Sequence, residues 1–267
     1  MVQAAYAGDL KGRLWKFDLS GASAASWKLA FNGSPLFTAP GGANQPITVQ
    51  PFVLNHPLNG KIIYFGTGKF MEVADKQTTA QQDFYAIWDS STGSGSVVES
   101  NLQPQAVNGS VISNGTTYFT STSNDVDWSV KKGWFLPLST TTPYMGERII
   151  YPAQTSRDRI IFSTASLNSA DPCESTGTGR VFELNAATGS MLNYRVLDTN
   201  GDNNINVSDL NVSGFGVGSG IPVISSIVGS PAGGENEVKI VSDTSGNLPT
   251  VLKEKGGNQR IMWRQIQ

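Results

Sequence analysis

The sequence predicts an all-β protein, and the arrangement of its strands predicts a β-propeller. Short apolar runs alternate with turns, and the chain of 267 residues contains 29 glycines and 13 prolines. A second observation is a recurring unit: a strand, a tight turn, an aromatic strand, and a closing D/N-x-x-(T)-G turn. This unit is typical of quinoprotein-like propeller blades, whose small sheets pack face to face. A β-sandwich is the alternative, because it too has short strands joined by turns.

The first unit occupies residues 5–21, AYAGDLKGRLWKFDLSG. Residues 5–8 are expected to form a short strand and residues 9–12 a turn. Residues 13–17 alternate in polarity, which predicts a second strand paired with the first. A further turn at residues 18–21 closes the unit.

Similar units return three times along the chain. One combines residues 61–68 with residues 84–88, the next combines residues 159–165 with residues 180–184, and the third places a strand at 238–242 before a turn at 243–248. Residues 260–266 resemble residues 14–19 in their apolar and aromatic alternation, and residues 131–136 are a further candidate strand. Three or four blades are expected, which indicates part of a larger propeller or a small diverged one. The polar tracts 75–83, 93–124 and 139–143 are expected to be inserted loops.

Composition excludes several classes of partner. The chain carries 19 Lys and Arg against 21 Asp and Glu, a net charge of −2, so no basic surface is expected to bind nucleic acid or anionic lipid. No apolar run approaches the roughly 18 residues of a membrane span. The first residues have neither the basic nor the apolar region of a secretion signal, so we expect a cytosolic protein or part of a longer chain. Cys173 is the only cysteine, which excludes a disulfide within the chain.

The stretch DTNGDNNINVSD, residues 198–209, has the ligand spacing of an EF-hand-type calcium loop. Positions 1, 3, 5, 7, 9 and 12 of such a loop supply oxygen ligands. Here those positions are occupied by Asp198, Asn200, Asp202, Asn204, Asn206 and Asp209. Alternate residues of a tightly curled loop can direct their oxygens at one centre, so the spacing predicts calcium binding of moderate affinity.

Two positions of this loop depart from the EF-hand pattern. Asn203 stands sixth, where glycine is usual, but Asn enters the left-handed backbone region more readily than other residues that have a side chain. Asp209 stands twelfth in place of the longer Glu, and loops of this kind resemble the dockerin type. Ile205, the eighth residue, is expected to turn inward and pack. The alternative is a polar connection that binds no ion.

Signals of catalysis are weak. His56 lies between turn residues and has no Ser or Cys nucleophile close in sequence, so a surface or hydrogen-bonded role is expected. Residues 66–69, Gly-Thr-Gly-Lys, lack the spacing of a phosphate-binding loop, and no pair of carboxylates has the spacing of an acid and base. The tryptophans are expected to pack between blades rather than to form a ligand platform: Trp15, Trp88, Trp128, Trp134 and Trp263.

Several separate segments occur in a fixed order over nearly the whole chain. They are YAGDLKGRLWKFDLS, PITVQPFVLNHPLNGKIIYFGTGKFMEVAD with QDFYAIWD, KKGWFLPL with GERIIYPAQTSRDRIIFSTASLNSADPC, and the terminal RIMWRQIQ. Together they resemble the C-terminal propeller domain of the PilY/PilC family of type IV pilus biogenesis factors and tip adhesins. Because unrelated motifs occur collinearly, the resemblance does not depend on the repeat alone.

The resemblance implies a single β-propeller domain over residues 1–267, the C-terminal portion of a longer pilus-tip protein. It implies a non-enzymatic role: priming pilus assembly with minor pilins, opposing retraction, and attaching to host-cell surface ligands. The implied location is the cell surface, at the pilus tip or the outer membrane. Family members commonly have a calcium loop directly before the YAGD strand. This chain begins at Met1, so residues 198–209 are a separate loop, and the role of the upstream site is not carried over to them.

Two competing functions share the blade pattern. In quinoprotein-like dehydrogenases a docking tryptophan typically follows the D-x-x-T-G turn, whereas Ser190 follows Gly189 here and Ser94 follows Gly93. With no quinone-binding constellation evident, we expect no enzymatic activity. The other competitor is a structural propeller that binds partner proteins within the cell envelope.

Overall fold

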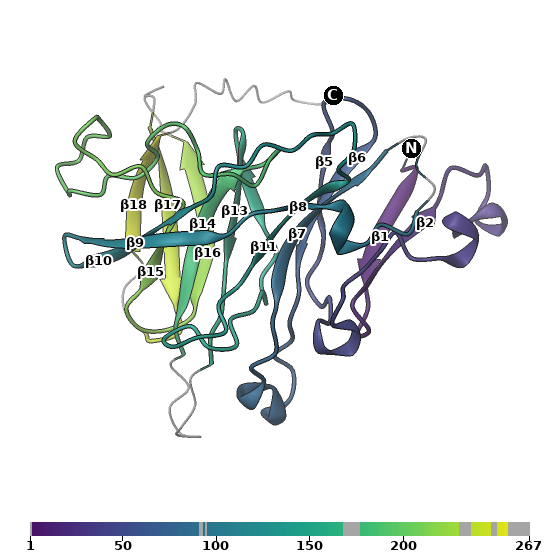
Figure 1. Cartoon of the computed structure of the whole chain (residues 1–267), viewed down its shortest axis with the longest axis horizontal. Coiled ribbons are helices and arrows are strands. Elements are labelled where there is room, and N and C mark those ends of the chain that lie inside the picture. Colours follow the sequence, from purple (N-terminus) through teal and green to yellow (C-terminus); the bar gives the residue numbers. More distant parts are fainter. Residues whose placement is uncertain are drawn as a thin grey trace, which may run out of the picture.

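The computed structural model describes residues 2–90, 93, 95–167, 177–229, 236–246 and 250–255. Within these residues the strands form four sheets, which follow one another along the longest dimension of the molecule (Figure 1). The all-β prediction is therefore confirmed. Cys173, Trp263 and the strand predicted over residues 260–266 lie outside the described residues.

The four sheets take their strands largely in chain order. The first sheet contains β1 (Ala4–Gly8), β2 (Arg13–Asp18), β3 (Lys28–Leu29) and β4 (Phe37–Thr38). The second has the order β5 (Phe52–Asn55), β6 (Lys61–Gly66), β7 (Asp83–Asp89), β11 (Gly133–Pro137) and β8 (Gln103–Pro104). The third has the order β12 (Gln154–Ser156), β13 (Arg159–Ser163), β14 (Gly179–Asn185), β15 (Gly214–Val217), β10 (Thr116–Ser121) and β9 (Val107–Ser113). The fourth contains β16 (Pro222–Gly229), β17 (Asn236–Asp243) and β18 (Thr250–Lys255).

Each repeated unit of the sequence forms an antiparallel pair of strands. β1 pairs with β2, β6 with β7, β13 with β14, and β17 with β18. In the first pair, Gly12 has a φ of 70° at the end of the turn, a conformation that glycine adopts without steric cost. A Cβ at this position would also lie 2.7 Å from the carbonyl oxygen of Gly42. The hairpins predicted from the sequence are therefore confirmed.

Side chains of the central strands point alternately to the two faces of their sheet, and apolar residues occupy both faces, so each face packs against a neighbouring sheet. On β6, Ile62 and Tyr64 enter the core shared with the third sheet, whereas Ile63 and Phe65 enter the core shared with the first sheet. Successive side chains of a strand point to opposite faces, so a continuous apolar run is buried on both sides. β7, β13 and β14 divide their apolar residues in the same way.

The contacts between sheets are aromatic and close. The rings of Phe84 and Phe162, from the second and third sheets, stack in parallel with their centroids 3.8 Å apart. Trp134 is fully buried beside them, and its indole Nε1 donates a 3.1 Å hydrogen bond to the carbonyl oxygen of Ala186. A series of four sheets that pack face to face is the arrangement of β-propeller blades and differs from the two layers of a sandwich.

One long insertion contains a hairpin that the sequence analysis assigned to loops. Within residues 93–124, β9 and β10 pair with each other, and β10 adds to β15 of the third sheet. Asn114 and Gly115 form the turn with φ values of 47° and 77°, and Asn-Gly between alternating runs is a strong hairpin signal. The prediction of a loop was wrong because the run TTYFTS is polar enough to resemble a connection.

The tryptophans are divided between cores and local contacts. Trp134 packs between sheets as expected, and Trp88 and Trp128 enclose a histidine, as described below. Trp15 departs from the expected packing between blades: it is half-buried, and its Nε1 donates a 3.0 Å hydrogen bond to Oδ2 of Asp9 in its own hairpin. The guanidinium of Arg13 lies 4.9 Å from its ring centroid. Trp15 therefore stabilises the β1–β2 hairpin.

Candidate functional site

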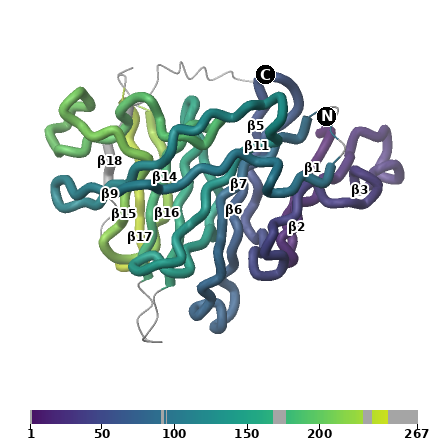
Figure 2. Tube along the Cα trace, viewed as in Figure 1, coloured from purple at the N-terminus to yellow at the C-terminus, as the bar shows by residue number. Residues whose placement is uncertain are grey.

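The acidic loop of residues 198–209 lies between β14 and β15, at the end of the molecule formed by the third and fourth sheets (Figure 2). It contacts the β9–β10 hairpin, where the Ser113 hydroxyl donates a 2.8 Å hydrogen bond to the carbonyl oxygen of Thr199. Gly201 approaches the same hairpin so closely that a Cβ would lie 2.7 Å from the side-chain nitrogen of Asn114. The loop is thus held against the β9–β10 hairpin.

Hydrogen bonds from the backbone curl the first half of the loop. Oδ1 of Asp198 accepts a 2.7 Å bond from the backbone NH of Gly201, and Oδ2 accepts a 2.7 Å bond from that of Asn203. Asn203 has a φ of 65°, so it adopts the left-handed conformation expected at the sixth position. The backbone NH groups of Asp202 and Asn204 donate to the side-chain oxygens of the residues two positions earlier. The first half of the loop is therefore a run of tight turns held by its own side chains.

Asp209 closes the loop from the buried side. It is 3% exposed, and its Oδ1 and Oδ2 accept bonds of 2.7 Å and 2.9 Å from the backbone NH groups of Thr199 and Asn206. The Thr199 hydroxyl also donates to Oδ1 at 3.2 Å. The twelfth residue therefore joins both ends of the loop, and Thr199 is a supporting residue that ligand spacing alone did not identify. Ile205 is only half-buried, so its predicted inward packing is partial.

The candidate ligands fall into two groups. The side chains of Asn200 and Asn206 come together on Asp202, with their Nδ2 atoms 3.3 Å and 3.5 Å from its Oδ2. Asp198 and Asp209 direct their oxygens to backbone NH groups instead. In the described part of the chain, no three His, Cys, Asp or Glu side chains gather closely enough to hold a metal ion.

The donor set nevertheless fits one class of cation. Every candidate side chain offers oxygen, and hard oxygen donors suit Ca²⁺ rather than zinc or copper. Each carboxylate oxygen of Asp198 accepts one hydrogen bond from the loop backbone, and such an oxygen retains a second lone pair for a cation. Burial, followed by the charges of Asp198 and Asp209, raises the pKa of Tyr118 on neighbouring β10.

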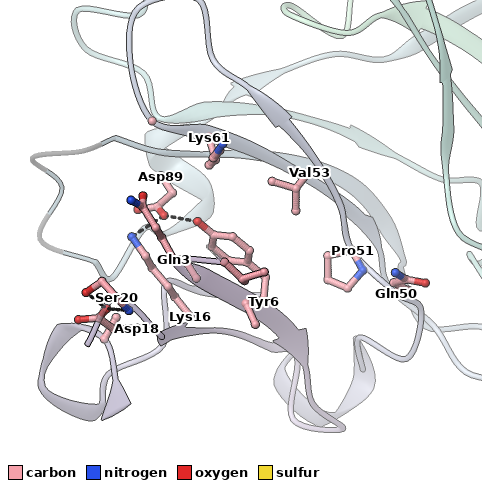
Figure 3. Close-up of a pocket in the computed structure, with 15 residues that line it drawn as sticks. Gln3, Tyr6, Lys16, Asp18, Ser20, Gln50, Pro51, Val53, Lys61 and Asp89 are labelled. Carbon is pink, nitrogen blue, oxygen red and sulfur yellow. Dashed lines mark hydrogen bonds and ion pairs between the residues drawn. The ribbon is translucent and has the colours of Figure 1, made fainter. Parts of the chain in front are cut away.

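A second feature is a groove of about 800 Å³ between the first two sheets. It is lined by residues of β1 on one wall and by residues 50–53 at the start of β5 on the other. Both strands lie at the edges of their sheets. Figure 3 shows Tyr6 and Lys16 reaching across the groove to Asp89 at the end of β7.

Asp89 is the buried acceptor of this groove. Its Oδ2 accepts a 2.5 Å hydrogen bond from the Tyr6 hydroxyl and forms a 2.6 Å ion pair with Nζ of Lys16. Burial, followed by the hydrogen bond to Asp89, raises the pKa of Tyr6. Asp18 and Asn185, at equivalent closing turns, bond the backbone of their own turns instead. Asp89 thus joins two blades, a role that the repeat pattern did not predict.

His56, the one histidine, is enclosed by aromatic rings. It stacks on Trp88 at 4.6 Å and meets the edge of Trp128 at 4.3 Å between ring centroids. Its Nδ1 accepts a 3.2 Å hydrogen bond from the backbone NH of Leu58, and burial lowers its pKa. The expectation of a hydrogen-bonded histidine is confirmed, and its position is buried rather than on the surface.

Among the described residues, no helix has the length and apolar character needed to span a membrane. The protein-family model described as the PilY1 beta-propeller domain matches residues 1–124 of the sequence. The Type IV pilus biogenesis factor PilY1 of Pseudomonas aeruginosa (strain PAO1) is 31% identical over 231 residues, which cover 73% of this chain and 20% of that protein. A PilY1 homolog of Xylella fastidiosa is 31% identical over 269 residues, covering 98% of this chain and 20% of that protein. The chain thus spans about one fifth of the length of these relatives.

A solved structure agrees with these relatives. The crystal structure of the Pseudomonas aeruginosa PilY1 C-terminal domain superposes with a TM-score of 0.73 at 25% sequence identity. The match covers 94% of this chain and 57% of that one. Sequence likeness, the family match and the shared arrangement of sheets therefore agree, and the chain belongs to the family of PilY1 C-terminal β-propeller domains.

Proposed function

We propose that this chain acts as the propeller domain of a type IV pilus biogenesis factor, supporting pilus assembly and surface attachment without catalysing a reaction. The observation that carries the proposal is the likeness to relatives named Type IV pilus biogenesis factor PilY1, one of which matches 98% of the chain. Minor pilins and the pilus tip are the proposed partners, with a host-cell surface ligand as a further one. The proposed location is the cell surface, at the pilus tip or the outer membrane.

The proposal is tested in the bacterium that encodes the chain. Deleting the coding segment for this domain should lower the amount of pili recovered by shearing intact cells, and restoring it should recover them. Pili that do assemble without the domain should bind host cells less well. Normal piliation and normal attachment in the deletion strain would exclude this function.

The competing functions predict different results. A quinoprotein-like dehydrogenase would reduce an artificial electron acceptor when quinone and calcium are added, whereas the proposed pilus domain would not. Aromatic side chains that could serve a quinone, such as Trp134 and Phe162, are instead buried between sheets. A structural propeller of the envelope would remain with the cell body after shearing, whereas a pilus-tip domain would appear in the sheared fraction.

We further propose that residues 198–209 bind one calcium ion. Side-chain oxygens of Asp198, Asn200, Asp202 and Asp209 would hold it, together with the Asn204 carbonyl and Asn206, directly or through water. The bound ion would supply positive charge that offsets the mutual repulsion of the three carboxylates. The chain's own residues already curl the loop, since Asn203 is left-handed and Asp209 joins its two ends.

Calorimetric titration of the chelator-treated protein with calcium tests this site. We expect about one ion per chain, with a higher melting temperature in calcium because a ligand of the folded state stabilises that state. Asp202→Ala should abolish both effects. Asp127→Ala is a matched control. The Asp127 carboxylate also accepts a hydrogen bond from a backbone NH two residues later, that of Ser129, and a second one from the Ser129 hydroxyl, but it lies outside the loop. No binding up to millimolar calcium would reduce the loop to a polar connection.

A further inference from the structure

The connection between β6 and β7 exposes three large apolar side chains close together in sequence. Phe70, Met71 and Val73 are 40%, 68% and 84% exposed. They belong to residues 69–77, named here the apolar loop, which includes the 3-10 helical segment Val73–Gln77. Figure 1 shows this segment, in blue, projecting beyond the ends of β6 and β7. Large apolar side chains exposed together on one segment are candidates for an interaction site.

The loop is held in this exposed shape by buried polar side chains. Arg148, only 2% exposed, donates hydrogen bonds of 3.1 Å, 2.7 Å and 2.6 Å to the carbonyl oxygens of Lys69, Asp75 and Thr78. Each of these bonds satisfies a backbone acceptor that the projecting chain would otherwise leave to solvent. A buried arginine therefore fixes the base of the loop to the core.

Asp75 organises the loop from within. Its Oδ2 accepts bonds of 2.8 Å and 2.9 Å from the backbone NH groups of Met71 and Glu72, and its Oδ1 forms a 3.0 Å ion pair with Nζ of Lys69. Asp75 is itself buried. The Asp75 carboxylate thus bonds the loop from within, whereas the side chains of Phe70, Met71 and Val73 are left exposed. A preorganised loop loses little conformational entropy when it binds.

The size of the loop indicates the kind of partner. A stable protein interface takes about 20–30 residues from each side, whereas the projecting segment has nine. A lipid interface needs only a few apolar side chains for weak and reversible binding, because the binding strength grows with the apolar area buried. The small convex loop therefore suits a bilayer surface better than a protein surface.

The charge of the loop indicates the kind of lipid. Residues 69–77 contain two lysines, Lys69 and Lys76, and two carboxylates, Glu72 and Asp75, so their charges sum to zero. Three of the four are joined in ion pairs, since Lys69 also lies 3.5 Å from Glu72. The loop has no net attraction to anionic headgroups, in keeping with the net charge of −2 for the whole chain.

From these contacts we propose that the apolar loop inserts Phe70, Met71 and Val73 into the interfacial region of a zwitterionic lipid bilayer. The contact is peripheral and reversible. Insertion buries the three side chains between headgroups and acyl chains, while the charged ends of Lys69 and Glu72 stay at the polar surface. Because the driving force is apolar burial, binding changes little with salt concentration.

Sedimentation with phosphatidylcholine vesicles tests the proposal on the whole chain. We expect binding that is unchanged between low and high salt. The double variant Met71→Ser/Val73→Ser should bind about a hundredfold more weakly, since burial of each of the two side chains contributes about a factor of ten or more. Ile112→Ser is the matched control: Ile112 is also strongly exposed, but it lies on β9, and its loss should leave binding unchanged.

A second measurement does not depend on the deletion of side chains. Phe70→Trp places an indole in the apolar loop, and brominated phosphatidylcholine should quench the added fluorescence. No vesicle binding by the intact chain would overturn the proposal, as would equal losses in the double variant and in Ile112→Ser. Capture of purified pilus subunits that is lost in the double variant, without vesicle binding, would also overturn it in favour of a protein partner.

Discussion

The hydroxyl of Tyr6 donates a 2.5 Å hydrogen bond to Oδ2 of Asp89, and this bond joins the first sheet to the second. Lys16 pairs with the same oxygen at 2.6 Å. Asp89 is almost fully buried, so its charge depends on these two partners for compensation. The contact lies in the groove between the two sheets (Figure 3).

Removing the Tyr6 hydroxyl should therefore destabilise the domain. We expect Tyr6→Phe to lower the free energy of unfolding by about 1–3 kcal/mol, because it removes a donor from a buried carboxylate. Tyr194→Phe is a suitable control, since the Tyr194 hydroxyl bonds Asp158 at an exposed position. Urea unfolding measures both variants. Equal losses would show that burial of Asp89 does not set the strength of the contact.

The core between the second and third sheets should depend strongly on Trp134. This side chain is fully buried among Phe84, Leu136 and other residues of both sheets. Trp134→Ala should cost about 3–5 kcal/mol through lost burial and the cavity that remains. Trp15→Ala, at a half-buried position on the first hairpin, should cost about 1–2 kcal/mol. Unfolding curves in denaturant that reversed this order would contradict the assignment of the core.

A buried carboxyl should make stability depend on pH. Asp83 has its pKa raised to about 6, first by burial, with nearby Glu99 adding to the effect. The Tyr85 hydroxyl lies 3.0 Å from Oδ2 of Asp83 and 2.6 Å from Oε2 of Glu99. A hydroxyl has one hydrogen to donate, so a protonated carboxyl is needed to complete both contacts.

Because the folded pKa of Asp83 exceeds its unfolded value of about 4, the folded state binds more protons between these values. The contribution of Asp83 to stability should therefore be present below pH 4 and fall by about 2–3 kcal/mol as pH rises through 6. Asp83→Asn should remove this dependence. His56, whose pKa is lowered by burial, contributes a slope of the opposite sign, so the quantity to measure is the difference between variant and wild type from pH 4 to 7.5. A difference that does not change with pH would contradict the raised pKa.

The third and fourth sheets should be coupled by a buried charge cluster. Glu183 pairs with Arg159 at 2.6 Å and also with Lys239, and Arg159 pairs with Glu237 as well. Glu183→Gln removes the carboxylate charge that both buried cations share, which should cost about 3–5 kcal/mol. Glu72→Gln breaks an exposed pair with Lys69 and should cost less than about 1 kcal/mol. Thermal unfolding compares the two, and similar small losses would show that the cluster is not needed for stability.

The sequence predicted the hairpins because their signal is local. Alternation along Ile62, Ile63, Tyr64 and Phe65 predicts a strand buried on both faces, and glycines mark the turns where the backbone needs a positive φ. The curled loop of residues 198–209 was predicted for the same reason, since Asn203 sets its shape locally. These features depend on neighbours along the chain.

The tertiary structure decided which distant groups meet. The repeat pattern treats Asp18, Asp89 and Asn185 as equivalent closing residues, yet only the packing of sheets brings Tyr6 and Lys16 to Asp89. Likewise, the Asn114-Gly115 turn marks the β9–β10 hairpin locally, but only the tertiary structure places β10 beside β15 in the third sheet. Local periodicity determines which residues form strands and which faces are apolar, whereas partners across sheets depend on which edges and faces come together when the core is buried.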